Sequence, residues 1–392
     1  MMTFYYIKTP VQKGLKVKVA IIKSNYTPFG GGEKYTTRLI KAFAARGGSV
    51  DVLTAVKGQW DAFDENVRWV RLRQVPYNNL LRLISFNASV NSHLETHSYD
   101  CVLGMDRTEA QTHLRAGGGC HAAWLRRRCA ETSMLRCLSF RVNPFHLNTL
   151  ALERKAFLSP GLKKIFCNSH LVRKEIEEFY PAVSRKLMVI HNGVEWHELS
   201  GPFRQASASK ESIRGHLDLR KGKFFFLFVG SGYARKGLGK VISALSLLPD
   251  DAELIVVGRD KKEEQYRDMA KKWGLSKRVH FFGPRKDVIP FYQTADAFVL
   301  PTLYDPFSNA SLEALAMGLY TVTSDANGCA EVIREGAGAV IPEPCTTGAA
   351  AAAMKTALEP HLSGEAIRES VRHLDFEDQL KKLVEVCIGD AG

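Results

Sequence analysis

The stretch FFFLFVGSGYARKGLGK (224–240) joins a continuous apolar run to a glycine-rich loop with two adjacent cations. Apolar residues then recur at 238, 241, 242, 245 and 248, which is the spacing of one helix face. A fully apolar strand followed by an amphipathic helix is typical of a parallel sheet covered on both faces. Ligands bind such sheets at the carboxyl ends of the strands, where this loop lies. Its glycines, its helix N–H groups and the charges of Arg235 and Lys236 suit a diphosphate, although an Arg-Lys pair is also common on ordinary surface loops.

The same alternation of strands and helices runs along the rest of the chain. Strands are predicted at 16–22, 49–55, 67–73, 99–105, 163–169 and 186–195, and then at 224–230, 252–258, 278–283, 297–301, 320–324 and 339–342. Between the two sets, SGPFRQASASKES (200–212) has the composition of a linker. The sequence therefore predicts an α/β fold with two doubly wound, Rossmann-like domains whose parallel sheets face a central cleft. We expect these domains in 1–197 and 198–370, and a C-terminal helix in 371–392 that returns to the first domain.

Composition restricts the partners and the compartment. A net charge of +13 favours an anionic partner, which could be nucleic acid, a membrane surface or a phosphorylated substrate, and it also serves solubility alone. The eight cysteines show no CxxC pair and no zinc-finger spacing, so we expect reduced, mostly buried thiols and a cytoplasmic protein. We see no signal-peptide pattern and no apolar run near the roughly 20 residues of a membrane span.

A second stretch, YDPFSNASLEALAMGLYTVTSDANGCAEVI (304–333), follows the strand that ends at Pro301. It contains a turn at Asp305 and a helix that opens near Ala310, with Glu313 in the first turn and Gly318 at the end. Ionised carboxylates only accept hydrogen bonds, so Asp305 and Glu313 suit the hydroxyl groups of a sugar. Helix-end electrostatics alone would also explain Glu313.

Together these stretches resemble the retaining GT-B glycosyltransferases of family 4, whose donor site pairs two acidic residues around a Pro-Phe turn with an upstream Lys-Gly loop. The resemblance covers most of the chain. It is similar in particular to lipopolysaccharide core glucosyltransferases, through FGGGEK (29–34), GCHAAW (119–124), VGSGYARKG (229–237) and FFGPRKDV (281–288).

The resemblance implies roles for individual residues. Arg235 and Lys236 would hold the donor diphosphate and stabilise the leaving group, and Glu313 would bind the ribose. Asp305 stands where the family has Glu, beside the donor sugar, and its side chain is one methylene shorter. His121 would lie near the donor sugar. The alternative is that His121 is a structural or surface residue. The other expected donor contacts are Gly30, Gly31, Gly32, Ser231, Gly283, Arg285, Phe307, Ser308 and Asn309.

The resemblance also implies the chemistry. The reaction would transfer a hexose, glucose in our interpretation, from a UDP-linked donor to a lipid-linked or lipopolysaccharide core saccharide at the cytoplasmic membrane face. It would need no metal, because the cations and a helix N-terminus carry the leaving charge. Mannosyl- or N-acetylhexosaminyltransfer from GDP- or UDP-sugars is the alternative within this fold. His191, which precedes Asn-Gly, is expected to be structural rather than catalytic.

Residues 107–141 form a basic segment with two acids, Glu109 and Glu131. Seven arginines stand at 107, 115, 126, 127, 128, 136 and 141, and they alternate with Trp124, Leu125, Leu135, Leu138 and Phe140. Such a segment suits an anionic membrane surface or a phosphorylated acceptor. The alternative is a solvated basic helix whose arginines pair with acids elsewhere.

Other functions fit less well. Epimerases of this fold lack the acidic pair, and glycogen- or sucrose-type synthases have no need of the basic segment. A dehydrogenase is disfavoured because cations stand where its fingerprint has a third glycine. Nucleic-acid binding is disfavoured by the absence of its sequence motifs. A non-catalytic nucleotide-sugar binder stays open, with Asp305 as its only hint.

Overall fold

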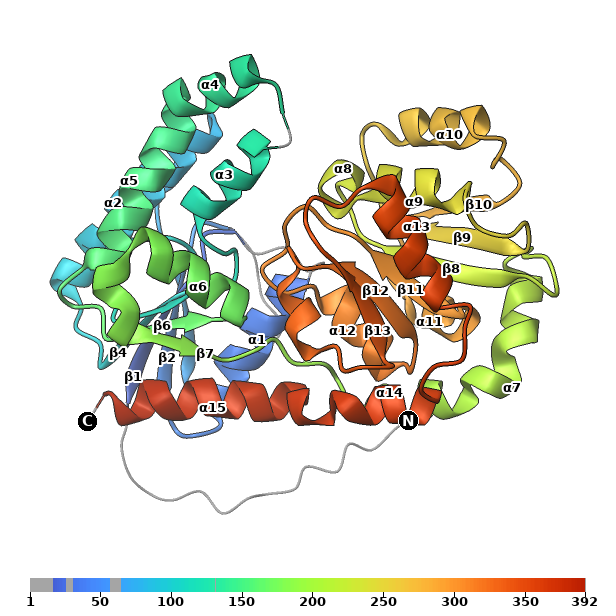
Figure 1. Cartoon of the computed structure of the whole chain (residues 1–392). Coiled ribbons are helices and arrows are strands. Elements are labelled where there is room, and N and C mark those ends of the chain that lie inside the picture. Colours follow the sequence, from blue (N-terminus) through green and yellow to red (C-terminus); the bar gives the residue numbers. More distant parts are fainter. Residues whose placement is uncertain (1–16, 26–30, 57–64, 131, 392) are drawn as a thin grey trace. The chain divides into compact units, whose positions relative to one another are not determined.

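The computed structural model describes residues 17–25, 31–56, 65–130 and 132–391. It contains two parallel β-sheets whose strands alternate with helices (Figure 1). The chain divides into two compact units: one is made of Met1–Arg115, Arg141–Phe166 and Leu380–Gly392, and the other of Ala116–Phe140 and Cys167–Gln379. We call these the first and the second unit.

The first sheet has the strand order β3-β2-β1-β4-β5-β6-β7. Its strands are β1 (Lys18–Ile22), β2 (Ser49–Thr54), β3 (Val67–Arg71), β4 (Cys101–Gly104), β5 (His113–Arg115), β6 (Lys164–Cys167) and β7 (Leu187–Val189). The strand β1 pairs in parallel with β2 on one side and with β4 on the other, so the order reverses at β1. This is a doubly wound topology.

Helices pack on the first sheet because its central strands β1 and β4 are mostly apolar and buried. The helices α1 (Gly31–Ala44), α2 (Asn79–Thr96) and α5 (Pro144–Leu158) belong to the first unit. On one face, Phe86 and Val90 of α2 pack against Ala20 and Ile22 of β1. The last helix, α15 (Phe376–Gly389), belongs to the first unit from Leu380 onward. The return of the C-terminal helix to the N-terminal domain stays a prediction.

The second sheet has the order β10-β9-β8-β11-β12-β13. Its strands are β8 (Phe224–Val229), β9 (Ala252–Val257), β10 (Val279–Gly283), β11 (Ala297–Leu300), β12 (Tyr320–Ser324) and β13 (Gly338–Ile341). The apolar run of β8 is fully buried from Phe225 to Phe228, as a strand covered on both faces requires. The strand order of the second sheet reverses at β8, which pairs in parallel with β9 and β11. The switch point therefore lies between β8 and β11. The stretch 224–240 contains β8, and the stretch 304–333 follows β11.

The helices of the second unit precede, connect or follow these strands. They are α3 (His121–Ala130), α4 (Met134–Val142), which ends in the first unit, α6 (His170–Phe179), α7 (Ser200–His216), α8 (Tyr233–Lys236), α9 (Leu238–Leu245), α10 (Glu263–Lys272), α11 (Ile289–Thr294), α12 (Asn309–Ala316), α13 (Thr347–Thr356) and α14 (Gly364–Ser370), with 3₁₀ turns η1 (Pro181–Lys186), η2 (Gly328–Val332) and η3 (Arg372–Leu374). No helix in the described residues combines the length and the apolar character needed to cross a bilayer.

The structure confirms the α/β fold with two parallel, doubly wound sheets, and it corrects one local prediction. Residues 200–212 are not a linker but most of helix α7. Gly201 and Pro202 stand in its first turn, where proline costs no hydrogen bond, and helix-forming Gln, Ala, Lys, Glu and Arg follow. Strand β5 was not predicted, because its three residues are too short for a periodic signal. The domain limits at 197 and 370 stay predictions.

Candidate active site

The glycine-rich loop after β8 is held in place by close backbone contacts. Gly232 and Gly237 have φ of 75° and 81°, a left-handed conformation that favours glycine. A Cβ at Gly237 would clash with the carbonyl of Pro301, so the loop lies directly against the end of β11. The Tyr233 N–H donates to Asp260 Oδ2 at 2.7 Å. The loop is therefore rigid, and it lies at the switch point of the second sheet.

Two predicted cations and one predicted carboxylate meet at this point. Lys236 Nζ forms an ion pair with Asp305 Oδ2, and both residues are only 8% exposed. Arg235 Nη1 lies 3.5 Å from the same oxygen and donates to the Tyr304 carbonyl at 3.0 Å. Two positive charges against one negative charge leave this cluster net positive. Buried charges interact strongly with an anionic ligand because water screens them little.

The turn before α12 is fixed by side-chain hydrogen bonds. Ser308 caps α12, because its hydroxyl accepts from the Ser311 N–H at 3.3 Å. The Ser308 N–H donates to Asn327 Oδ1 at 3.0 Å, so this amide is already engaged within the protein. Asn192 Nδ2 donates to the Phe307 carbonyl at 3.2 Å and to Asn309 Oδ1 at 2.8 Å. Phe307, Ser308 and Asn309 thus form one pre-organised turn next to Asp305.

Glu313 lies half-buried one turn into α12. The Tyr292 hydroxyl, from α11, donates to Glu313 Oε2 at 2.9 Å. Burial, followed by the Glu313 charge, raises the pKa of Tyr292 well above its usual value, so this hydroxyl stays a donor. Tyr292 therefore orients the carboxylate predicted to bind ribose. Sequence reasoning missed this tyrosine, because nothing in its local spacing points to Glu313.

The remaining predicted donor contacts on the second sheet stand on neighbouring loops. Ser231 Oγ accepts from the Arg259 N–H at 3.3 Å, which joins the loops after β8 and β9. The Gly258 N–H donates to the Gly283 carbonyl at 3.0 Å, which joins the loops after β9 and β10. Arg285 is exposed two residues beyond Gly283. These loops follow strands that are adjacent in the sheet, so they gather at one sheet edge.

His121 opens α3 directly after the glycines at 117–119. Gly119 has φ of 72°, and a Cβ there would clash with the Tyr304 hydroxyl and approach Pro306. This glycine loop therefore packs against the turn that carries Asp305. The His121 ring stacks on Trp124 with 5.3 Å between ring centroids. The glycine before α3 lies beside the 304–306 turn. The role of His121 near the donor sugar stays a prediction.

A buried network that sequence reasoning missed holds Tyr304. The Tyr304 hydroxyl donates to Glu175 Oε2 at 2.7 Å, and Arg127 Nε donates to Glu175 Oε1 at 3.2 Å. Burial raises the pKa of Glu175, and burial followed by the Glu175 charge raises that of Tyr304. The network links α3, α6 and the residue before Asp305. No sequence signal joins these positions, which are far apart in the chain.

The predicted glycines of the first unit can be placed only in part. Gly31 and Gly32 are the first residues of α1, and Gly30 lies outside the described residues.

His191 has a carboxylate partner, and its structural role stays a prediction. Its Nε2 lies 2.6 Å from Glu331 Oε1, and this carboxylate also accepts the N–H groups of His170 and Leu171 at the start of α6. Among the described residues, two groups of three side chains have a metal-binding composition, and neither includes Asp305 or Glu313.

Two arginines of the basic segment have acidic partners on α6. Arg126 pairs with Glu178, and Arg127 pairs with Glu175, both on α6. The alternative of arginines paired with acids elsewhere therefore holds for these two. The helix α4 exposes large apolar side chains: Met134 is 87% and Leu135 is 82% exposed.

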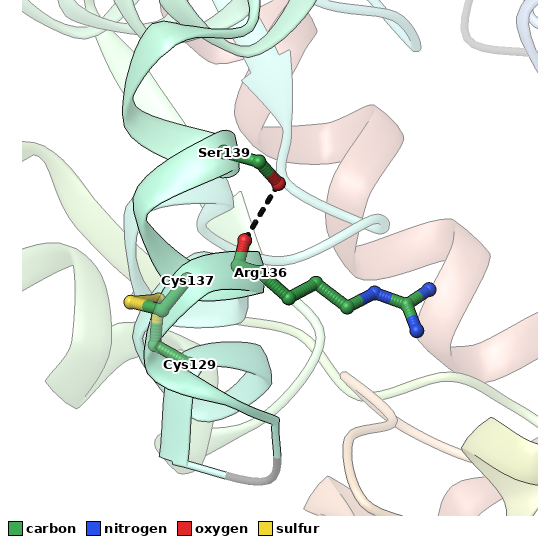
Figure 2. Close-up of a disulfide and its surroundings, with 4 residues drawn as sticks. All are labelled: Cys129, Arg136, Cys137 and Ser139. Atoms are coloured by element: carbon green, nitrogen blue, oxygen red, sulfur yellow. Dashed lines mark hydrogen bonds between the residues drawn. A yellow bond between two sulfur atoms is a disulfide. The ribbon is translucent and has the colours of Figure 1, made fainter.

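A disulfide between Cys129 and Cys137 joins the end of α3 to α4 (Figure 2). The prediction that all thiols are reduced is therefore wrong for these two cysteines. The chain reverses between α3 and α4, which brings their Cα atoms to 4.8 Å, within disulfide range. The other six cysteines are buried thiols that form no disulfide in the described residues, as expected.

Two family models match the chain in succession. Residues 29–197 match Glycosyltransferase Family 4, and residues 209–373 match Glycosyl transferases group 1. The chain is a GT-B glycosyltransferase. The glycosyltransferase is 27% identical over 379 residues to lipopolysaccharide glucosyltransferase WaaG of Escherichia coli strain K12, covering 94% of this chain and 96% of WaaG.

Solved structures agree with this family. A crystal structure of WaaG superposes with a TM-score of 0.77 at 25% identity, covering 95% of this glycosyltransferase and 100% of that chain. Anabaena Alr3699/HepE, in complex with UDP and glucose, has the same fold, with a TM-score of 0.69, 18% identity and coverage of 95% and 100%. The glycosyltransferase therefore shares the WaaG fold over nearly its whole length.

Proposed function

We propose that this glycosyltransferase moves glucose from UDP-glucose to a lipid-linked or lipopolysaccharide core saccharide, with retention, at the cytoplasmic face of the inner membrane. The observation that carries the proposal is the convergence of Lys236, Arg235 and Asp305 at the switch point of the second sheet. Similarity to WaaG over nearly the whole chain supports the donor and acceptor classes.

The cations would stabilise the leaving group. The bond between the anomeric carbon and the diphosphate oxygen breaks, and the acceptor hydroxyl oxygen bonds to the same face of that carbon. Its proton passes to the departing phosphate oxygen. Lys236 and Arg235 would bind the charge that grows on the diphosphate, which is where such enzymes gain most of their rate. Because two side chains supply this positive charge, we propose a reaction that needs no metal.

Asp305 would exchange partners when the donor binds. In this structure its carboxylate accepts from Lys236. A diphosphate next to Lys236 would compete for the ammonium group and free Asp305 Oδ2 to accept a sugar hydroxyl. The side chain is one methylene shorter than Glu, and the fixed turn from Phe307 to Asn309 would hold it within reach.

The remaining donor contacts follow from the loops. Glu313, oriented by Tyr292, would accept both ribose hydroxyls. The backbone around Gly283, with Arg285, would bind the base. Ser231 and the glycines Gly30, Gly31 and Gly32 would contact the diphosphate and sugar, and His121 would lie near the sugar.

We propose that the membrane contact is made by α3 and α4 within the basic segment 107–141. Met134, Leu135 and Leu138 are exposed on α4, and apolar side chains of this kind insert into the headgroup region. Arg126 and Arg127 are held by α6, so they would contribute less than arginines without acidic partners. The phosphorylated acceptor would approach the same positive face.

A transfer assay tests the proposal. Purified protein with EDTA would be given radiolabelled UDP-glucose, UDP-galactose, UDP-N-acetylglucosamine or GDP-mannose, together with lipopolysaccharide that ends at the inner core. We expect label in the lipopolysaccharide from UDP-glucose only. Transfer from another donor would mean that the enzyme transfers that donor's sugar and not glucose. No transfer from any donor, in folded protein that still binds UDP, would indicate a non-catalytic binder.

A further inference from the structure

Three side chains of metal-binding type meet inside the first unit, away from the residues assigned to glycosyl transfer. They are Cys101 of β4, His113 of β5 and Cys387 of α15, and all three are fully buried. Cys387 belongs to the segment 380–392, which packs in the first unit. The cluster therefore joins the last helix of the chain to two adjacent strands of the first sheet.

The ligand atoms lie close enough together to bind one metal ion. Cys101 Sγ lies 3.4 Å from His113 Nδ1, and the three ligand atoms lie within 4.8 Å of one another. Zinc bonds of about 2.3 Å to sulfur and about 2.0 Å to nitrogen place the ligand atoms of a tetrahedral site about 3.6–3.8 Å apart. Small side-chain rotations would reach that geometry.

The second ring nitrogen of His113 has the partner that a ligating histidine needs. His113 Nε2 lies 3.2 Å from Asp390 Oδ2, on the helix end that also carries Cys387. A carboxylate here keeps the proton on Nε2 and leaves the Nδ1 lone pair directed at the thiols. Lys163 Nζ donates to the Asp390 carbonyl, which fixes this helix end.

The charges of such a site also balance. Two thiolates and one neutral imidazole around a divalent ion have no net charge, so the site does not bury an uncompensated charge. Binding would release the two thiol protons, and no oxidant or reductant is involved. Three protein ligands leave a fourth position, and Thr112 Oγ1, 2.9 Å from His113 Nδ1, places an oxygen at the edge of the cluster.

We propose that Cys101, His113 and Cys387 bind one Zn²⁺ ion that fastens the C-terminal helix to the first sheet. The ion is structural: its ligands belong to the first unit, whereas Lys236, Asp305 and Glu313 belong to the second. It takes no part in the proposed transfer step.

Metal content tests the proposal directly. Untagged protein, purified without chelators and with reductant, would be analysed for zinc by mass spectrometry. We expect close to one zinc per chain, and little zinc in Cys387→Ser or Cys101→Ser. The matched control is Cys345→Ser, which changes another free buried cysteine in the second unit and should keep its zinc.

A spectroscopic measurement on the wild-type chain avoids dependence on variant folding. Protein stripped with a chelator and titrated with Co²⁺ should develop sulfur-to-cobalt charge-transfer absorption that saturates at one equivalent and disappears when Zn²⁺ is added. Its melting temperature should rise on addition of Zn²⁺. Folded wild-type protein with neither zinc nor this absorption would overturn the proposal. So would a Cys101–Cys387 disulfide in protein freshly isolated under reductant.

Discussion

Two positively charged regions of the second unit are alike in sequence and different in structure. In the loop after β8, Arg235 and Lys236 converge on Asp305 at the buried end of a sheet. In α3, Arg126 and Arg127 pair with Glu178 and Glu175 along α6. The first cluster keeps an excess positive charge at a fixed point, whereas the second is largely neutralised. Position at the end of a parallel strand, and not the number of cations, is therefore the reason why we propose the first cluster as the ligand site.

Replacement of Lys236, in the first of these two regions, should cause the largest loss of transfer activity. In Lys236→Ala we expect transfer to fall about 10²–10³-fold, since a preorganised group that stabilises the leaving charge contributes about that much. Arg235 remains 3.5 Å from Asp305, so the carboxylate keeps a partner and the fold should persist. Steady-state transfer kinetics measure the loss. Lys271→Ala, on the exposed last turn of α10, is the control and should behave as wild type.

The second region should respond through its apolar residues. Met134→Ser combined with Leu135→Ser should weaken sedimentation with anionic liposomes about 10²–10⁴-fold, because each of the two buried apolar side chains contributes about 1.5–3 kcal/mol. Arg126→Ser should cost less than the roughly 1 kcal/mol of a basic residue without an acidic partner, because Arg126 pairs with Glu178. Leu247→Ser, which removes another exposed apolar side chain, is the control. A larger loss in Arg126→Ser than in the apolar pair would reverse this interpretation.

Glu313→Gln tests whether Glu313 binds the ribose of the donor. The change keeps the shape and removes the charge that accepts the ribose hydroxyls, so we expect the KM for the donor to rise about tenfold, the effect of a lost charged hydrogen bond. Tyr292→Phe should give a smaller rise, since it removes only the group that orients the carboxylate. Equal donor KM values in Glu313→Gln and wild type would remove Glu313 from the site.

Glu175 should affect stability more than catalysis, and its effect should depend on pH. Its pKa is raised above 4.5 by burial, so its stabilising contribution is fully present below pH 4.5 and is lost as the pH rises through the folded-state pKa. Glu175→Gln removes this dependence. Urea unfolding from pH 4 to 7 should therefore show the free energy of unfolding of wild type falling relative to the variant. A constant difference would mean that Glu175 has an ordinary pKa.

The sequence predicted the elements whose signals are local. The apolar run of β8 and the helix after it lie where their periodicity placed them, and the order of strands and helices established a doubly wound fold. Lys236, Arg235 and Asp305 could be singled out because strand ends define a site in this architecture. Residues 200–212 were wrongly predicted to be a linker, because Gly201 and Pro202 are common in linkers. The first turn of a helix also accepts both residues.

Features that depend on distant contacts could not be predicted. Tyr304 and Glu175 are separated by 129 positions and meet only after folding. The Cys129–Cys137 disulfide depends on the turn between α3 and α4, and the Cys101–His113–Cys387 cluster depends on the return of α15. Local sequence patterns such as hydrophobic periodicity do not reveal contacts between residues that are far apart in the chain.

Calorimetric titration of UDP in the presence of EDTA tests the central claim most directly. The wild-type protein and Lys236→Ala would be compared after thermal unfolding shows that both are folded. We predict saturable binding of one UDP per chain to the wild type without metal, and binding to Lys236→Ala that is at least tenfold weaker. Equal affinity in the two proteins would contradict the assignment of the Lys236–Asp305 cluster as the diphosphate site.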